Sequence, residues 1–212
     1  MAAASTSLPR PGGYRRRHLL PMALLVIVLA VASILTWIVV FANSTSQSVT
    51  SCTAPASGGG TVQARTALDQ TAAAAPSATA VRVLNGAGQR GAGQLAAVEL
   101  GELGMPEAAP ADNDPLYPAQ DLDCVGQIRY GPDGASAART LSLVLPCAEL
   151  VSDGRQGAAV DLALGSDFRD VTPGQATADA LKALARSSES GAAVPGTDPA
   201  SLSVLRDVDC SQ

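Results

Sequence analysis

Histidine, lysine and aromatic residues are scarce in this sequence. His18 and Lys182 are the only residues of their kinds, and aromatic residues make up 3% of the chain. His18 precedes the long hydrophobic stretch described below, so the sequence after that stretch has no histidine. This excludes nucleophiles activated by histidine, and zinc sites with histidine ligands, from that part. The lack of aromatic rings also leaves little surface on which sugars could stack, which argues against a glycosidase.

Lysine-dependent catalysis lacks its motif as well. A Ser-x-x-Lys arrangement needs a serine three residues before Lys182, and Asp179 occupies that position. Paired aspartates of the kind that supply acid and base groups, or bind calcium weakly, are mostly solvated turn formers. These pairs are Asp112/Asp114, Asp121/Asp123 and Asp207/Asp209. We predict that the protein is not an enzyme and that it holds no cofactor or metal.

One long hydrophobic stretch, from Leu19 to Ala42, contains no charged residue. It exceeds the roughly 20 residues that span a bilayer. Arginines without an acidic residue precede it, and such residues stay on the cytoplasmic side: they are Arg10, Arg15, Arg16 and Arg17. We predict a cytoplasmic tail (1–18), a transmembrane helix (19–42) and an extracytoplasmic remainder. A cleaved signal peptide is the alternative, but the stretch exceeds the roughly 7–15 apolar residues of a signal core.

The sequence beyond this stretch is acidic and holds all the cysteines. It carries ten of the 14 basic residues and all 19 acidic ones, a formal charge of −9. Nucleic-acid binding needs a basic face, so it is excluded, and the basic tail suits anionic lipid heads instead. Outside the cytoplasm disulfides persist, and four cysteines predict two of them: Cys52, Cys124, Cys147 and Cys210.

The element pattern predicts a stalk, a small domain and a C-terminal segment. Residues 43–79 begin rich in Ser, Thr and Gly, which is typical of a flexible stalk, and 62–75 reads as a short helix. Residues 80–170 give the order β-α-(β)-β-α-β-β, an α/β (α+β) fold that forms a two-layer sandwich with helices on one face. Four prolines make 106–121 a loop with at most a short edge strand. A helix and a disulfide-tied tail complete residues 171–212.

Four cysteines permit three pairings, and the predicted strands favour one. Cys124 and Cys147 each precede a strand, and a helix connects the two strands. If these strands are parallel neighbours, their spacing of about 4.8 Å lies within the range that a disulfide needs. We therefore expect Cys124 to pair with Cys147 and, by elimination, Cys52 to pair with Cys210.

A glycine motif follows the first predicted strand of the domain. Gly86-x-Gly88-x-x-Gly91 formally matches the dinucleotide fingerprint. Dinucleotides are not free outside the cytoplasm, and the following strand lacks a clean terminal acid for the ribose. A helix N-terminus beside Arg90 still offers donors to an anionic group of a polymer or lipid. The candidate ligand-binding residues are therefore Asn85, Gly86, Gly88, Arg90 and Gly91.

Several runs in this region resemble the LytR C-terminal domain. The principal one is Val81-Arg82-Val83-Leu84-Asn85-Gly86-Ala87-Gly88-Gln89-Arg90-Gly91, followed by Gln94-Leu95-Ala96. The others are Ile128-Arg129-Tyr130-Gly131, Ala137-Ala138-Arg139 and the closing Val160-Asp161-Leu162-Ala163-Leu164-Gly165-Ser166-Asp167-Phe168. The resemblance covers about residues 80–170. It implies a role in the cell envelope, and the family has no established catalytic residues to transfer.

Relatives of this family that transfer wall polymers carry an additional catalytic domain, for which this chain has no room. The resemblance therefore implies a non-catalytic, membrane-anchored extracytoplasmic protein that contributes to envelope integrity. As a scaffold, it would dock on envelope or cell-wall synthesis proteins or on itself as a homo-oligomer, and would expose an apolar patch on the sheet face without helices. As a direct binder of peptidoglycan, wall polymer or lipid, it would have a concave site around Asn85, Gly88 and Arg90. A role as accessory to a wall-polymer transferase is a remote third.

Overall fold

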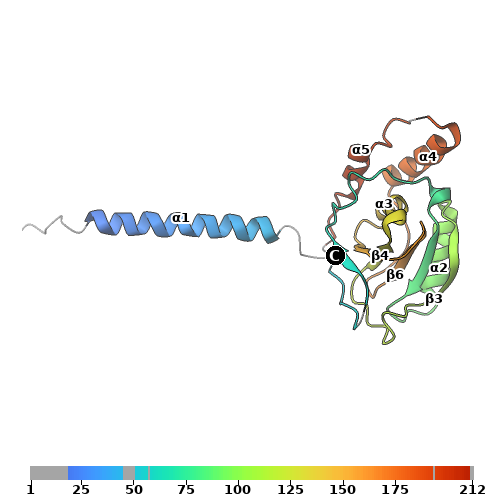
Figure 1. Cartoon of the computed structure of the whole chain (residues 1–212), viewed down its shortest axis with the longest axis horizontal. Helices are drawn as coiled ribbons and strands as arrows, with labels where there is room; N and C mark the ends of the chain where they lie inside the picture. The colour runs from blue at the N-terminus through green and yellow to red at the C-terminus, as the bar shows by residue number, and fades with distance from the viewer. Residues whose placement is uncertain (1–18, 45–50, 57, 193, 211–212) are drawn as a thin grey trace, which may run out of the picture. The chain divides into compact units, whose positions relative to one another are not determined.

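The structure, a computed structural model, describes residues 19–44, 51–56, 58–192 and 194–210, with side chains for 22–34 in the first range. The chain divides into two compact units, Met1–Thr45 and Ser46–Gln212, and each is described by itself (Figure 1). The predicted cytoplasmic tail (1–18) and part of the predicted stalk (45–50) lie outside the described residues.

The first unit holds the helix α1 (Leu19–Ser44), which covers the hydrophobic stretch of the sequence. Its described side chains, from Met22 to Ile34, are exposed. Over the residues that the structure describes, no helix meets the combined length and apolarity of a membrane span. The transmembrane assignment of residues 19–42 therefore stays a prediction.

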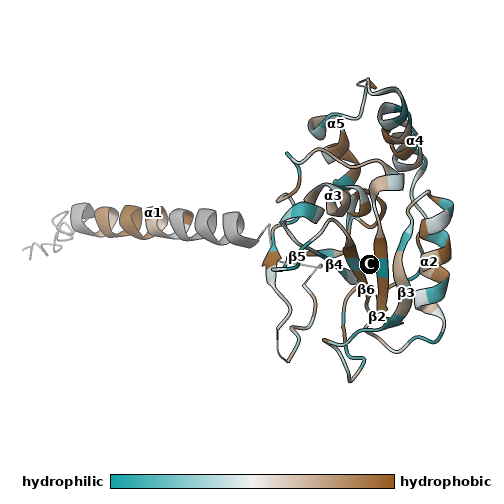
Figure 2. Ribbon diagram, turned by 45° about the vertical axis from the view of Figure 1, so that its right-hand side comes forward, coloured by the Kyte–Doolittle hydropathy of each residue, from teal (hydrophilic) through white to brown (hydrophobic). Residues whose placement is uncertain are grey.

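The second unit is built on a mixed six-stranded sheet in the order β1-β5-β4-β6-β2-β3. Strand β2 runs parallel to both β3 and β6, and β4 runs parallel to β5, whereas β4–β6 and β1–β5 are antiparallel. Figure 2 shows β5, β4, β6, β2 and β3 side by side in this order. The strand bounds are β1 Thr61–Gln63, β2 Val81–Asn85, β3 Glu107–Asn113, β4 Gly126–Tyr130, β5 Glu149–Ser152 and β6 Val160–Leu164.

Helices cover one face of this sheet. The crossover helices α2 (Ala92–Glu102) and α3 (Ala135–Val144) connect the parallel pairs β2–β3 and β4–β5. Alternate strand side chains, among them Val83, Ile128 and Leu162, form the core with α2, α3 and α4. The remaining elements are α4 Gln175–Ser190, α5 Pro199–Ser203 and the short 3-10 turns η2 Pro76–Ala78, η3 Pro132–Gly134 and η4 Val204–Arg206. The prediction of a small mixed α/β domain is confirmed.

The opposite face of the sheet, called the open face here, presents polar side chains. They come from alternate positions of four strands: Arg82, Gln127, Arg129, Glu149 and Asp161. A small apolar cluster of Leu84, Tyr117, Leu122, Cys124 and Ala163 packs beside them. The prediction of an exposed apolar patch on this face is therefore wrong. Among the described side chains of this unit that are large, apolar and exposed, the strand register places only Val62 on the open face.

The structure contains two disulfides, as predicted, but the predicted pairing of the cysteines is wrong. Cys52 bonds to Cys124 and Cys147 bonds to Cys210, with Cα–Cα distances of 4.9 and 5.5 Å. The strands β4 and β5 are parallel neighbours as expected. Cys124 nevertheless packs in the apolar cluster of the open face, and Cys52 packs against the same cluster, with its N–H donating to Glu149 of β5. The N-terminal part of the domain therefore brings Cys52 to Cys124, whereas Cys147, in the turn between α3 and β5, pairs with Cys210 of the C-terminal tail.

Two predicted segments also differ from the structure. The segment 62–75, predicted as a helix, begins within strand β1, where Val62 pairs with Val151, and continues in turns. Cys52, within the predicted stalk, is bonded to the domain. The segment 106–121, predicted as a loop with at most a short edge strand, holds the edge strand β3, which is longer than expected at seven residues. Its proline, Pro110, is tolerated because β3 is an edge strand with irregular register.

Candidate functional site

A polar cleft of about 390 Å³ lies where β2 and β3 end. The register pairs Asn85 with Asn113, the last residues of these two parallel strands, so their carboxyl ends meet at one edge of the sheet. In open sheets with crossover helices, this is the edge at which ligands bind. The residues that line the cleft are Asn85, Gly88, Arg90, Gly91, Gly93, Gln94, Ala111, Asp112, Asn113 and Gln120.

Asn85 shapes the glycine turn on one side of the cleft. Its Oδ1 accepts hydrogen bonds from the N–H groups of Ala87 (3.2 Å) and Gly88 (3.0 Å), and its Nδ2 donates to the carbonyl of Gln89 (2.7 Å). These bonds occupy both ends of the side-chain amide. We conclude that Asn85 positions the turn and that other residues of the cleft are freer to contact a ligand.

The helix α2 begins at the cleft without a side-chain cap. Its N-cap residue, Gly91, has a φ of 79°, which favours glycine. Gly93 and Gln94 lie in the first turn, whose N–H groups have no partner within the helix. Arg90 is exposed beside them, and none of the hydrogen bonds or ion pairs among the described residues involves its side chain. This side of the cleft therefore offers hydrogen-bond donors.

The opposite wall comes from the loop after β3. Gln120 has a φ of 57°, the one positive value among the described residues other than glycine. Such a backbone conformation costs free energy and persists only where the surroundings fix it. Gly88 faces it closely: a Cβ on Gly88 would lie 2.7 Å from Gln120 Oε1. The side-chain amide of Gln120 also donates to Asn113 Oδ1 at 3.4 Å.

A buried ion pair between the open face and this loop holds the loop in place. Arg129 donates to both carboxylate oxygens of Asp114, at 3.0 and 2.7 Å, and both side chains are almost completely buried. Arg129 also donates to Gln127, which donates to Glu149. Backbone bonds from Asp114 to Asn85, and from Leu122 to Gly86, attach the two ends of the loop to the end of β2. The ion pair therefore helps to fix the position of the loop after β3, which forms this wall of the cleft.

Tyr117, within the same loop, covers the ion pair. Its ring centre lies 5.6 Å from the Arg129 guanidinium carbon, and its hydroxyl donates to the carbonyl of Thr53. Burial raises the pKa of the Tyr117 phenol, and the positive charge of Arg129 opposes this effect. The N-terminal segment of this unit, residues 51–56, is therefore held by the Cys52–Cys124 disulfide and by this hydrogen bond to the loop.

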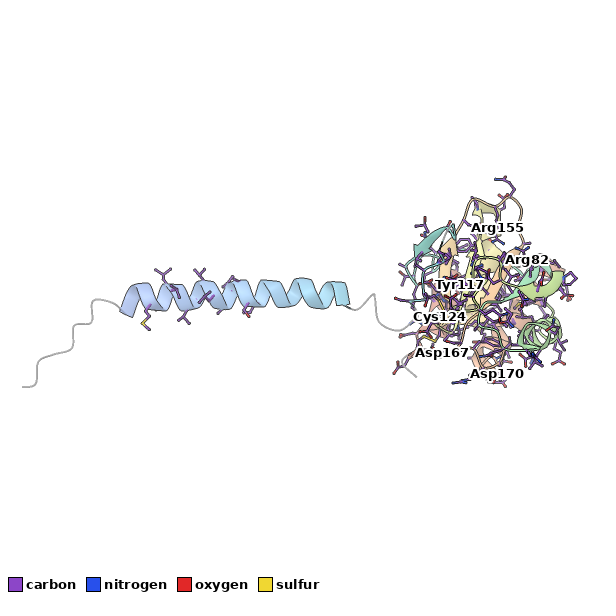
Figure 3. All side chains as sticks on the ribbon, turned by 90° about the horizontal axis from the view of Figure 1, so that it is seen from below. Arg82, Tyr117, Cys124, Arg155, Asp167 and Asp170 are labelled. Atoms are coloured by element: carbon purple, nitrogen blue, oxygen red, sulfur yellow. A yellow bond between two sulfur atoms is a disulfide. The ribbon has the colours of Figure 1, made fainter. Side chains whose placement is uncertain are left out.

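A second ion-pair group lies further along the open face. The carboxylate of Asp161 forms ion pairs with Arg82 and Arg155, with nitrogen–oxygen distances of 2.5 and 2.8 Å. Arg155 also pairs with the carboxylate of Asp153 at 2.6 Å. In Figure 3 the labelled Arg82 and Arg155 lie on the side of the domain away from Asp170. Burial acts to raise the pKa of Asp153, but hydrogen bonds from Arg155 outweigh it and leave that pKa lowered. With two arginines and two aspartates, the group has no net charge. We therefore interpret it as stabilising the fold.

The chemistry of the cleft suits hydroxyl groups. Its side chains are one guanidinium, one carboxylate and the amides of Asn85, Gln94, Asn113 and Gln120, so its side-chain charges cancel. Side-chain amides both donate to and accept from sugar hydroxyls, and a carboxylate accepts from them. A strongly anionic ligand would need an excess of positive charge, which this cleft does not provide.

The structure brings four of the five predicted ligand residues to the cleft. Asn85, Gly88, Arg90 and Gly91 line it, whereas Gly86 is buried, and a Cβ there would lie 2.8 Å from Leu122 Cδ2. Gly86 therefore permits close packing and does not line the cleft. The predicted ligand residues do not include Asp112, Asn113 and Gln120, because the sequence alone does not establish which strand the segment 106–121 pairs with. The signal that locates them is the parallel pairing of β2 and β3, since it brings both strand ends together.

Comparison with known proteins gives consistent relatives. Residues 78–168 match the LytR_C family, described as LytR cell envelope-related transcriptional attenuator. The chain is 34% identical over 205 residues to the cell envelope integrity protein Cei of Mycobacterium tuberculosis, covering 93% of this chain and 92% of that protein. A crystal structure of the soluble domain of a conserved hypothetical secreted protein from Mycobacterium marinum matches with a TM-score of 0.62 and 35% identity, over 71% of this chain and 98% of that one. This similarity over nearly the full length shows that the chain belongs to the LytR_C family, in the same group as the mycobacterial envelope integrity protein.

Proposed function

We propose that this protein is a non-catalytic, membrane-anchored component of the cell envelope whose extracytoplasmic domain binds a hydroxyl-rich envelope glycan in the cleft. The observation that carries the proposal is the charge-balanced, amide-lined cleft at the meeting ends of β2 and β3. The relative named for envelope integrity supports the cellular setting.

The membrane anchor in this proposal is α1. Its 26 residues correspond to about 39 Å of helix, more than the roughly 30 Å of a bilayer core. The sequence from Leu19 to Ala42 is uncharged, and the arginines before it favour a cytoplasmic N-terminus. The secreted relative of known structure and the two disulfides support an extracytoplasmic position for the second unit.

The test is binding of the full-length protein, in detergent, to soluble glycan fragments released from the envelope of its own bacterium. Arg90→Ala and Asn113→Ala should each weaken binding about tenfold, the loss expected for one good hydrogen-bonded contact. Arg186→Ala removes an exposed arginine on α4 and serves as the matched control. Equal binding by all four proteins would refute the cleft as the glycan site.

A protein-docking role is the second candidate, and one observation favours it. Leu95 and Val98, on the outer side of α2, are 55% and 60% exposed, and they follow Gln94 at the rim of the cleft. Crosslinking and pull-down from the native membrane, with mass spectrometry for proteins and glycan and lipid analysis of the same eluate, separates the two candidates. Loss of a stoichiometric protein with Leu95→Ser and Val98→Ser would favour scaffolding. Loss of a glycan with Arg90→Ala would favour direct binding.

A further inference from the structure

Three arginines and one aspartate gather in a part of the domain that the cleft does not use. Arg139 of α3 and Arg206 of η4 both donate to Asp69 Oδ1, at 2.8 and 3.1 Å. Arg65 donates to the carbonyl of Arg206 at 2.8 Å, and Arg206 donates in return to the carbonyl of Arg65. This arginine cluster joins the turns after β1 to the C-terminal segment.

Two of these guanidinium groups are buried without enough partners. Arg139 is 0% exposed and Arg206 is 5% exposed. Arg139 Nε, Arg206 Nε and Arg206 Nη2 have no hydrogen-bond partner among the described residues. A buried donor without an acceptor costs free energy, and the cost is larger for a charged group.

The unpartnered atoms of Arg206 have a specific geometry. Nε and Nη2 form one edge of the guanidinium, and their two N–H groups point in parallel. This edge binds two oxygens of a carboxylate or phosphate at once. Arg206 therefore presents a complete two-donor edge, while its Nη1 donates to Asp69 and to the carbonyl of Arg65.

The cluster also has an excess of positive charge, with three arginines against the carboxylate of Asp69. Burial lowers the pKa of Arg206, the charge of Asp69 opposes this, and the charges of Arg139 and Arg65 lower the pKa further. Burial likewise lowers the pKa of Arg139, against the effect of Asp69. An additional anion would offset the excess positive charge and would favour the charged forms of Arg139 and Arg206.

We propose that the arginine cluster is a binding site for an oxyanion, a phosphate or carboxylate group, held by the Nε and Nη2 edge of Arg206. Arg139 and Arg65 supply the surrounding positive charge. Asp69 is partly exposed, so the cluster lies close to the surface. The site shares no residue with the cleft, so it goes beyond the proposed glycan function.

The experiment measures the melting temperature of the full-length protein in detergent while sodium phosphate, or sodium acetate, replaces sodium chloride at constant ionic strength. At a concentration a hundredfold above Kd, phosphate should raise the melting temperature by roughly 5–10 °C. A rise with phosphate alone assigns the site to phosphate groups, and a rise with both anions assigns it to oxyanions in general. No rise with either anion would overturn the proposal, because water would then suffice to solvate the cluster.

Variants locate the effect. Arg206→Lys keeps the charge but removes the two-donor edge, and Arg206→Met removes both, so each should lose at least three quarters of the rise. Arg90→Ala, in the cleft, should keep the full rise. If Arg90→Ala abolishes the rise and the Arg206 variants retain it, the anion binds at the cleft and the arginine cluster is not the site. Failure of glycan binding with an intact phosphate effect would leave this inference standing and refute only the proposed function.

Discussion

The two faces of the sheet are built from the same strands but perform different tasks. The face beneath the helices is apolar, with Val83, Ile128 and Leu162 packed against α2, α3 and α4. The open face carries buried ion pairs and amides that hold the loop 114–122 and the N-terminal segment. Burial of apolar surface stabilises the fold without directing any ligand. The polar face determines where the wall of the cleft stands, and the predictions below test this division.

The largest effect is expected at the ion pair of the open face. Arg129→Met leaves Asp114 buried without its partner, which should lower the free energy of unfolding by roughly 3–5 kcal/mol. It should also weaken glycan binding, since the loop loses its support. Urea denaturation and the glycan-binding assay measure the two effects. Adding Asp114→Leu should recover at least half of the stability but not the binding; recovery of both would show that the pair does not position the loop.

The helix-covered face should respond in stability alone. Leu162→Ala removes a core side chain that is 1% exposed and should lower the free energy of unfolding by roughly 2–5 kcal/mol. Glycan affinity of the remaining folded protein should stay within twofold of the original. A marked loss of affinity at temperatures where the variant is folded would contradict the division between the faces.

The disulfide on the open face should contribute somewhat less. Replacing both Cys52 and Cys124 by serine should lower the free energy of unfolding by roughly 2–4 kcal/mol, because a loop of 72 residues is no longer closed. Mass spectrometry of the unreduced, protease-digested protein checks the pairing directly. A peptide linking Cys124 to Cys147 would contradict the structure and restore the pairing expected from the sequence.

Two glycines of the turn allow a matched test of the cleft. Gly88 and Gly91 have φ values of 71° and 79°, so alanine at either position should cost about 1 kcal/mol of stability. A Cβ at Gly88 would also meet Gln120, whereas a Cβ at Gly91 would meet no atom within 4 Å. Gly88→Ala should therefore reduce glycan affinity much more than Gly91→Ala. Similar losses would mean that the wall formed by Gln120 is unimportant.

The smallest effect concerns pH and the ion pairs at the margin of the open face. Because the pKa of Asp153 is lowered in the folded protein, its contribution to stability is complete above its ordinary value of 3.8 and is lost as pH falls through the folded value. The pair is partly exposed, so the contribution should be about 1 kcal/mol or less. Melting temperatures from pH 6 to pH 2.5 should fall more steeply for the original protein than for Asp153→Asn. Parallel curves would show that the pair contributes nothing.

The sequence predicted the covered face better than the open one. Alternation from Val81 to Leu84 and spacing through Leu141 identify strands and helices, because apolar periodicity reports directly on burial. No local pattern reports that Arg129 is buried against Asp114, since both types are ordinarily exposed. The predicted pairing of Cys124 is wrong for a similar reason: its partner, Cys52, lies 72 residues earlier, and no local pattern reports that Cys52 packs beside Cys124.

The candidate site shows the same limit. Gly88, Gly91 and Arg90 are close in sequence to the turn they form, and the glycine spacing revealed them. Asn113 and Gln120 reach the cleft through the parallel edge strand β3, whose partner in the sheet cannot be inferred from the proline-rich segment 106–121 alone. Contacts between distant segments, here 28 residues apart for Asn85 and Asn113, require the sheet topology before they can be inferred.

The two disulfides determine how the domain would respond to mechanical force. Cys52–Cys124 closes a covalent ring that contains β1, β2, α2 and β3, and Cys147–Cys210 closes another that contains β5, β6, α4 and α5. Only β4, η3 and α3 lie between the rings. A pull on the chain at either side of the domain cannot unravel either ring while its sulfur bond is intact. Tension that enters at Cys52 is delivered next to β4 in the middle of the sheet, so the domain would resist being peeled open from its edge.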